Sequence, residues 1–343
     1  MTPPFDFPLG KLQNVLILSV SAKGGLVNAF VQSKNAGRVI GVDTDPYAPA
    51  GLLCHAFHAI PPQDDPTCAA RIREICEQEH IGLMVPTREA DIYFLNKVFP
   101  NAEIPIAGSS EACIELCEDK WKTQKWLAGR QFPTPPTVTA EEAKRALPFP
   151  EFPLIAKSPT GSGSREVRMI RKPQDLEYIP DNWLVQPLLA GKEYTLNTYV
   201  DRTGHCTVVI PHLRMATDAG EVSRGITERN PMLIDLARDI SESLPGAYGP
   251  LTIQAFWDHP TGALAITDIN PRFGGGYPLA HAAGGHFTEW LLAEAQGITL
   301  PQEQPHWQEN LMMLRYRESL FTTAENKPIA KHPKASSPEL SYS

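Results

Sequence analysis

The sequence lacks both a long hydrophobic run and an excess of positive charge. No stretch approaches the roughly 20 consecutive apolar residues that a transmembrane helix needs. The N-terminus has no basic segment ahead of its short apolar run, so we expect that run to be a buried strand and not a signal peptide. Lys and Arg number 31 against 39 Asp and Glu, which gives a net charge of −8. These features argue against a membrane protein and against nucleic-acid binding through a general basic surface, and we expect a cytoplasmic protein.

Motifs built on paired cysteines or on common nucleotide-binding loops are also missing. None of the six cysteines forms a CxxC pair, which favours reduced thiols packed as small hydrophobic groups over disulfides or a metal site. The Ser21–Gly25 turn lacks the GxGxxG spacing, which argues against a nicotinamide cofactor. The glycines at 161 and 163 follow a lysine and precede no GK[ST], so the chain has no P-loop there.

The composition otherwise fits a globular protein of two or three domains. Hydrophobic residues make up 42% and charged residues 20% of the 343 residues, and one domain takes roughly 150 residues. In the first hundred residues, short apolar runs alternate with helical patterns, which predicts a parallel sheet with helices on both faces. The expected strands are Val15–Val20, Arg38–Val42, Ile81–Val85 and Ile104–Ala107, and the expected helices are Leu26–Lys34 and Cys68–Glu79.

Two acids, Asp43 and Asp45, follow the second of these strands. Open α/β sheets place ligand contacts at the carboxyl ends of their strands, which makes both acids candidates for ligand binding. Asp side chains also cap turns. Both interpretations stay open for this pair.

The rest of the chain has a different pattern. A helix is expected from about Ser110 to Arg130, with Ser109 or Ser110 as its N-cap, and three prolines then interrupt the chain. Beyond Phe152, hairpin signals separate the strands, which predicts an antiparallel sheet. The expected strands are Leu154–Lys157, Val167–Ile170, Trp183–Gln186, Tyr194–Tyr199, Thr207–Ile210, Leu251–Trp257 and Ala263–Ile269, and the expected helices are Ile226–Leu244 and Gly284–Glu294. We divide the chain into units at 1–108, 109–190 and 191–326, with a disordered tail over 327–343.

The stretch from Ile266 to Gly276 carries the clearest chemical signal. A strand directs alternate side chains to one face, so Asp268, Asn270 and Arg272 are expected to point the same way. Carboxylate and amide oxygens are hard ligands that suit Mg²⁺, and an arginine beside them can hold a phosphoryl group. The alternative is a strand that ends in a glycine turn with an Asp–Arg pair on the surface.

Gln254 lies on the strand before this one. If the two strands pair across the Asp258–Gly262 turn, the Gln254 amide reaches the same face and adds a contact near the metal. Alternatively, Gln254 is an outward polar residue of an amphipathic strand.

Two further clusters suit a nucleotide. Lys157 ends an apolar strand and precedes a Gly/Ser loop, which supplies a fixed cation and accessible backbone N–H groups for polyphosphate. After the next strand, the backbone of 186–188 can pair with an adenine edge, and Glu193 can accept hydrogen bonds from ribose hydroxyls. Both clusters also fit ordinary surface hairpins when each is taken alone.

Taken together, these clusters resemble the ATP-grasp superfamily, and within it the carboxylate–amine ligases that are similar to carbamoyl-phosphate synthetase. The ordered set covers about residues 12–300 and includes a front part that resembles the pre-ATP-grasp domain. The fold implied is a mixture of α/β and α+β, with a parallel-sheet domain at 1–108 followed by a two-lobed ATP-grasp unit. Its small lobe with a lid spans 109–190 and its large lobe spans 191–326. The motif residues are Asp119, Lys120, Lys157, Gly161–Ser164, Gln186–Glu193, Gln254, Asp268, Asn270 and Arg272.

The resemblance implies a role for each of these positions. Lys120 and Lys157 correspond to the lysines that contact the nucleotide, and Arg272 corresponds to the arginine that steadies the acyl phosphate. The loop residues Ser162, Gly163 and Ser164 correspond to the lid, Gln186 and Leu188 to the adenine hinge, Glu193 to the ribose acid, and Gln254, Asp268 and Asn270 to the metal ligands. The chain departs from the family at Asp268, where Glu is usual, and at Gln186, where many relatives have an acid. The shorter arm of Asp268 leaves open whether one or two metal ions bind.

The implied activity is an ATP- and Mg²⁺-dependent ligase, with Mn²⁺ as a substitute metal, that joins a small carboxylate to an amine such as an amino acid or peptide. Arg214 is our candidate for holding the substrate carboxylate, ahead of Arg224, and His212 lies beside it. His281 and His286 are expected in the core or at a helix end. The alternatives are an enzyme that phosphorylates bicarbonate, as carboxylases and carbamoyl-phosphate-type enzymes do, and an idle ATP-binding module. Homodimers are common among such relatives, so that assembly stays open.

Overall fold

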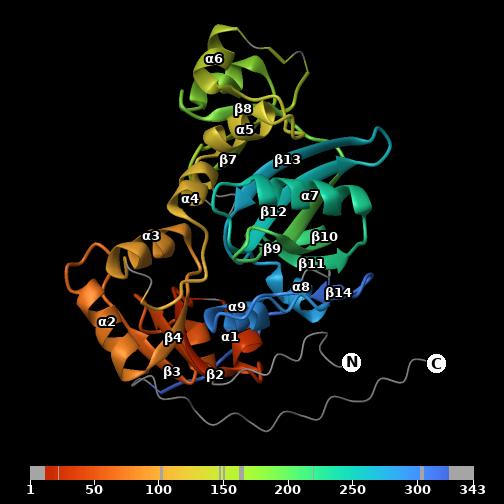
Figure 1. Ribbon diagram of the computed structural model, residues 1–343. Coiled ribbons are helices and arrows are strands. Elements are labelled where there is room, and N and C mark those ends of the chain that lie inside the picture. Colours follow the sequence, from red (N-terminus) through yellow and green to blue (C-terminus); the bar gives the residue numbers. More distant parts are fainter. Residues whose placement is uncertain are drawn as a thin grey trace.

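The computed structural model describes residues 12–21, 23–100, 103–146, 148–149, 151–161, 166–218, 220–301 and 305–323. The disordered tail expected at 327–343 lies outside these ranges, and so do Ser162, Gly163 and Ser164. Three sheets lie one after another along the chain (Figure 1). Within the described ranges, no helix is both long and apolar enough to span a bilayer.

The first sheet is parallel, as the sequence predicts. Its strand order is β3-β2-β1-β4, and alternate residues of β1 enter two different cores, one on each face: Val15 and Ile17 on one side, Leu16 and Leu18 on the other. The strands are β1 (Gln13–Leu18), β2 (Ala36–Asp43), β3 (Ala56–Ala59) and β4 (Ile81–Val85), and the helices are α1 (Gly24–Val31), η1 (Pro49–Leu53), α2 (Cys68–Gln78) and α3 (Glu89–Val98). The strand expected at Ile104–Ala107 is wrong. It is one bridge, between Ile106 and Met84, because Pro105 has no backbone N–H to offer a ladder.

The helix expected from Ser110 to Arg130 is two helices, α4 (Glu111–Glu118) and α5 (Lys120–Gly129). Ser110 caps α4 as predicted, since its side chain accepts from the Cys113 N–H. Asp119 then adopts an extended backbone, and its carboxylate accepts from the N–H groups of Trp121 (2.8 Å) and Lys122 (3.1 Å). An acid that bonds to its own backbone interrupts one helix and starts the next.

A small antiparallel sheet follows, with the strand order β5-β8-β6-β7. Its own hydrophobic core is separate from the others and includes Leu154, Ala156, Ile170 and Val185. The elements are β5 (Val138–Thr139), α6 (Ala140–Arg145), β6 (Leu154–Lys157), β7 (Val167–Ile170), η2 (Pro173–Tyr178) and β8 (Leu184–Pro187). The predicted bounds of β6 and β7 are confirmed.

The third sheet has six antiparallel strands in the order β13-β12-β9-β10-β11-β14. These are β9 (Lys192–Val200), β10 (Cys206–Asp218), β11 (Glu221–Thr227), β12 (Gly249–Asp258), β13 (Ala263–Asn270) and β14 (Met312–Leu314), with helices α7 (Pro231–Ser243), α8 (Tyr277–Ala282) and α9 (Phe287–Ala295). Helix α7 packs on β9 and β10. The helix expected from Ile226 begins only at Pro231, where Asn230 caps it, because residues 221–227 pair with β10 as a strand.

Helices α8 and α9 belong to the core of the first sheet as well as to that of the third. One cluster of buried side chains contains Phe30 of α1, Tyr199 of β9, and Phe287 and Trp290 of α9. Figure 1 shows α9 and α1 between the two sheets. The parallel sheet therefore shares its interior with the large sheet.

All six cysteines are free thiols, five of them buried and Cys54 partly buried. The expectation of reduced, packed cysteines is confirmed.

Candidate functional site

Asp268, Asn270 and Arg272 form one row at the end of β13, as the strand alternation predicts. The Asn270 Nδ2 donates to Asp268 Oδ2 at 3.1 Å, and the Arg272 Nη2 donates to Asn270 Oδ1 at 3.1 Å. A single asparagine thus links the carboxylate to the guanidinium.

Gln254 lies next to this row. It pairs directly with Asp268 in the β12–β13 ladder, so the expected pairing across the Asp258–Gly262 turn is present. Directly paired residues of an antiparallel ladder have side chains on the same face. Gln254 and Asp268 therefore share one surface.

Lys157, at the end of β6 in the small sheet, contacts β13 of the large sheet. Its Nζ donates to the Thr267 carbonyl oxygen at 3.2 Å. Burial lowers the pKa of Lys157 to about 8, against an upward pull from the Asp268 carboxylate and a further downward push from Lys120. A desolvated lysine beside a carboxylate (Asp268) and a second lysine (Lys120) is typical of a site that binds an anionic ligand.

Lys120 is the first residue of α5 and lies against the loop that follows β6. Its backbone N–H donates to the Pro159 oxygen at 2.8 Å, and its Nζ donates to the Gly161 oxygen at 2.6 Å. The structure thus joins the two lysines to one loop. The lid positions Ser162, Gly163 and Ser164 lie outside the described residues.

The expected adenine hinge lies at the end of β8. Gln186 is buried and pairs with Ile155 of β6, and its Nε2 donates to the Thr137 hydroxyl at 2.7 Å. The Leu188 side chain is half exposed, and its backbone N–H donates to the Pro153 oxygen at 3.3 Å. The hinge amide therefore already has a weak partner within the protein.

Glu193 and Arg214 are assigned separate roles from sequence, but they contact one another. The Arg214 Nη1 lies 3.2 Å from Glu193 Oε1, and its Nη2 donates to the Gly220 oxygen at 2.9 Å. Burial raises the pKa of Glu193, and the positive charge of Arg214 opposes that shift. The remaining guanidinium nitrogen, Nε, is buried without a hydrogen-bond partner.

Glu89 is a residue of this site that the sequence did not indicate. Its Oε1 lies 2.9 Å from Arg272 Nε, outside hydrogen-bond alignment, and both side chains are largely buried. Glu89 is the first residue of α3, so the parallel sheet supplies the counter-ion of the candidate phosphoryl-binding arginine. The one available signal was its position just past the carboxyl end of β4.

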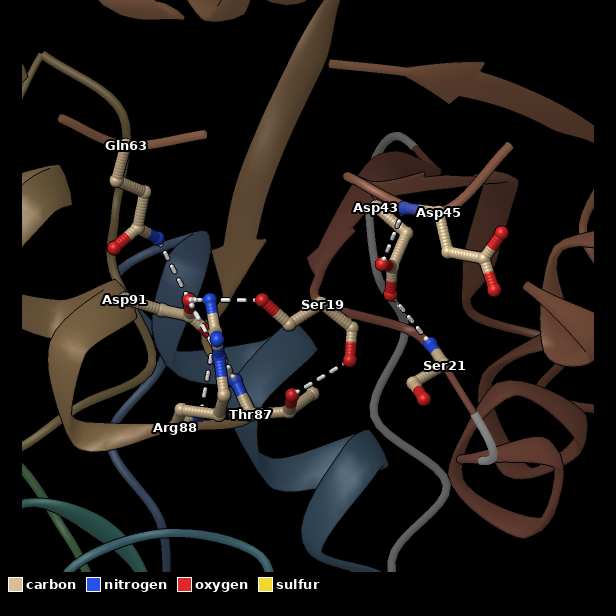
Figure 2. A network of polar contacts seen from close by, with 8 residues as sticks. All are labelled: Ser19, Ser21, Asp43, Asp45, Gln63, Thr87, Arg88 and Asp91. Carbon is tan, nitrogen blue, oxygen red and sulfur yellow. Dashed lines mark hydrogen bonds and ion pairs between the residues drawn. The ribbon is translucent and has the colours of Figure 1, made fainter. Parts of the chain in front are cut away.

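A polar network fixes the loops at this carboxyl edge (Figure 2). The fully buried Asp91 accepts from Ser19 Oγ (2.9 Å), Gln63 Nε2 (2.8 Å) and Arg88 Nη2 (2.8 Å). Thr87 Oγ1 donates to the Ser19 oxygen at 2.9 Å. The loop after β4, which leads into Glu89 of α3, is therefore tied to the loop after β1.

Asp43 and Asp45 act as turn-capping residues. Asp43 accepts from the N–H groups of Ser21 (2.8 Å) and Asp45 (3.0 Å), and Asp45 accepts from the Tyr47 N–H at 2.8 Å (Figure 2 for the first two). Of the two interpretations that the sequence left open, turn capping is the one the contacts support.

Of the three candidate histidines, His212 is buried, and His281 and His286 are partly buried. His212 is fully buried. It accepts from Asn197 Nδ2 at its Nδ1 (3.0 Å), and its Nε2 has no partner. Burial lowers the pKa of His212 to about 3 and that of His281 to about 4. His281 contacts the Tyr277 hydroxyl at 3.2 Å, and its ring lies edge-on to His286, as expected for core histidines.

The donor set fits magnesium held jointly with a nucleotide. Among the residues that the structure describes, no group of three or more His, Cys, Asp or Glu side chains is arranged to hold a metal. Mg²⁺ is commonly held by one or two carboxylates together with substrate phosphates, and Asp268 with the amide of Gln254 matches that pattern. Asn270 would have to rotate its amide to offer an oxygen, because Oδ1 now accepts from Arg272.

Comparison with known proteins agrees with this geometry. Residues 117–276 match the family model described as an ATP-grasp domain, and residues 15–105 match the one described as a PylC-like N-terminal domain. The chain is similar to the carbamoyl phosphate synthase large chain of Xylella fastidiosa, at 26% identity over 44% of this chain and 16% of the relative. The chain thus spans about a sixth of the length of that curated relative.

Among solved structures, the chain resembles the biotin carboxylase domain of 2-oxoglutarate carboxylase from Hydrogenobacter thermophilus, with a TM-score of 0.71 and 16% identity. The match covers 88% of this chain and 74% of that one. N5-carboxyaminoimidazole synthetase from Staphylococcus aureus in complex with ADP gives a TM-score of 0.69 and 16% identity, over 86% and 80% of the two chains. These likenesses confirm the predicted fold: a parallel-sheet domain followed by an ATP-grasp unit.

Proposed function

We propose that this chain, which belongs to the ATP-grasp superfamily of ATP-dependent ligases, joins a small carboxylate to an amine. ATP and Mg²⁺ are the cofactors of this proposal, as in the MgADP complex of the structural relative. The observation that carries it is the row Asp268–Asn270–Arg272 beside the partly buried Lys157.

The reaction proceeds in two steps. A carboxylate oxygen attacks the γ-phosphorus of ATP, and ADP leaves with the electron pair of the broken bond, which forms an acyl phosphate. The amine nitrogen then attacks the acyl carbon, phosphate leaves, and one proton leaves the nitrogen. Phosphoryl transfer of this kind depends mainly on positioning and on charge stabilisation.

Each part of the site contributes one of these functions. Lys157 and Lys120 would bind the phosphate oxygens, whose negative charge would oppose the fall in the Lys157 pKa that burial causes. Arg272, held by Asn270, would stabilise the negative charge of the acyl phosphate. It would also stabilise the charge that develops when the amine displaces phosphate. Magnesium, held by Asp268 and Gln254, would neutralise the phosphates during transfer.

On the nucleotide side, Gln186 and Leu188 would receive the adenine. Glu193 would receive the ribose. Arg214 opposes the rise in the pKa of the partly buried Glu193, which gives Arg214 an indirect role beside that of holding the substrate carboxylate.

The first test measures phosphate release from ATP and Mg²⁺ with a panel of amino acids as acid and amine. Wild type should release phosphate with at least one pair. The Arg272→Ala variant should lose kcat by about 100-fold or more, with ADP affinity changed little. If no pair releases phosphate, or if Arg272→Ala is as fast as wild type, the proposal is wrong.

Bicarbonate is the second candidate acid, because the two structural relatives described above include a bicarbonate complex and a carboxyaminoimidazole synthetase. Their 16% identity establishes a shared fold and leaves the substrate open. Stimulation of ATP hydrolysis by bicarbonate, without any amino acid, would favour this candidate over the amide ligase.

A further inference from the structure

Three charged side chains from distant parts of the chain meet beside the glycines at 274–276, which follow β13. Glu221, at the start of β11, lies 3.5 Å from Lys23 Nζ through Oε1 and 2.8 Å from Arg315 Nη1 through Oε2. Arg315 also donates from Nη2 to the Gly275 oxygen at 2.5 Å. Two cations therefore share one carboxylate, which leaves a surplus positive charge at this point.

The cluster lies close to the reacting centre. Gly275 is three residues from Arg272, so their Cα atoms are at most about 11 Å apart. Lys23 comes from the loop after β1, at the same carboxyl edge of the parallel sheet as Glu89, the first residue of α3. A side chain on Gly275 would overlap the Glu221 carboxyl carbon, 2.7 Å from the ideal Cβ, so glycine keeps the carboxylate near the backbone.

The cluster is accessible to solvent. The exposed fractions of the Lys23, Glu221 and Arg315 side chains are 31%, 48% and 32%. A pair with this exposure contributes little to stability, so two ion pairs on one glutamate are not needed to hold the fold. An accessible cation pair beside a reaction centre suits a ligand anion better.

We propose that Lys23 and Arg315 form a subsite for a carboxylate of the substrate other than the one that is phosphorylated. In the free protein, Glu221 occupies both cations. A substrate carboxylate replaces it on Arg315 in the two-point geometry that guanidinium favours, and Glu221 is then free to accept from a substrate ammonium group. The subsite thus selects substrates of the amino-acid class, and this rests on the ligase function proposed above.

The shared chemistry is a free carboxylate, which either the amine partner or the acid partner can bring. Kinetics distinguish the two sources. For the substrate pair with the highest turnover, each partner is replaced in turn by the analogue in which the second carboxylate is a carboxamide. The partner whose replacement raises KM is the one that the subsite holds.

The variants are Arg315→Ala, Arg315→Lys and Lys23→Ala. Arg317→Ala is the matched control, because Arg317 lies two residues on and pairs with the exposed Asp218 at 2.5 Å and not with Glu221. Arg315→Ala should raise KM for the carboxylate-bearing substrate by about 10- to 100-fold, the loss of one charged hydrogen bond, with KM for ATP changed less than about threefold. Arg315→Lys should restore part of the loss, and Arg317→Ala should match wild type. Equal effects of Arg315→Ala on the substrate and its carboxamide would overturn the proposal.

A binding experiment separates this inference from the ligase function, because it needs no turnover. The thermal midpoints of wild type and the variants are measured with millimolar L-alanine, L-aspartate and L-lysine, and with the corresponding carboxamides. At least one amino acid should raise the midpoint of wild type and of Arg317→Ala, but not that of Arg315→Ala. If no amino acid stabilises wild type, or if Arg315→Ala responds equally, the subsite is refuted even where ligase activity is found.

Discussion

The fold lowers the pKa of Lys157, and this shift makes the stability of the protein depend on pH. Its folded pKa of about 8 lies below its ordinary value of 10.5. Between these values the unfolded chain binds more protons than the folded one, so stability rises with pH across this window. Below pH 8 both states are protonated, and the cost of burying the charge is present in full.

We therefore expect Lys157→Met to unfold at a higher urea concentration than wild type at pH 7. The difference should shrink as the pH rises from 8 towards 10.5, where the wild-type amine becomes neutral. Urea unfolding followed by circular dichroism at several pH values measures this. The control is Lys122→Met, an exposed lysine of the same region, which should show no such trend. A difference that is constant with pH would contradict the interpretation.

Most residues of the candidate site can be predicted from the sequence, and those that were missed were missed for one reason. Strand alternation predicts that Asp268, Asn270 and Arg272 share one face, and the turn at 258–262 predicts that Gln254 joins them. Glu89, Lys23 and Arg315 were missed because their partners are far away in the sequence. No local pattern says that the loops after β1 and β4 meet the end of β13.

At the scale of elements, Asp119 has the most direct consequence, because it separates two helices and starts the one that carries Lys120. Its carboxylate satisfies two N–H groups of α5. We expect Asp119→Ala to lower the free energy of unfolding by about 1 kcal/mol and to raise KM for ATP, because Lys120 loses its fixed position. Asp119→Asn keeps an acceptor and should recover most of both losses. Equal effects of the two variants would show that the charge matters, not the cap.

Gly276 illustrates a different constraint on an element. Its φ of −84° suits any residue, but an ideal Cβ would lie 2.5 Å from His212 Cε1. His212 is fully buried in the large sheet and cannot withdraw easily. We expect Gly276→Ala to destabilise the protein by about 1–3 kcal/mol through overpacking. The control is Gly129→Ala in α5, where a Cβ meets nothing within 4 Å; it should be neutral or stabilising by up to about 1 kcal/mol. If Gly276→Ala leaves the free energy of unfolding unchanged, the His212 ring can move aside.

Element prediction failed where a local feature overrides the periodicity. The helix expected from Ser110 to Arg130 breaks at Asp119 because of the contacts of one side chain, which a hydrophobic pattern does not show. Residues 221–227 precede a helical stretch, and their pairing with β10 is a tertiary preference. The short runs β6, β7 and β4, bounded by turn residues, were predicted to the residue.

At the scale of the whole molecule, the parallel sheet and the large sheet share one core. Phe30 is fully buried in the cluster that also holds Tyr199, Phe287 and Trp290. We expect Phe30→Ala to cost about 3–5 kcal/mol, and to loosen α9 together with α1. Hydrogen exchange should rise in both helices and remain near wild type in β6 and β8, whose core is separate. An increase confined to residues 13–98 would contradict the shared core.

The separation of cores also bears on motion during the catalytic cycle. Two of the three sheets are fastened through common aromatic side chains, whereas the small sheet has its own interior and reaches β13 through Lys157, which bonds to Thr267. We expect opening and closing to be a rotation of the small sheet, with the other two moving together as one body. Fluorophores on Tyr178 and Leu12, both exposed and on the two sides of that boundary, should change their separation when nucleotide binds. A pair placed on Tyr47 and Met232, within the joined sheets, should not.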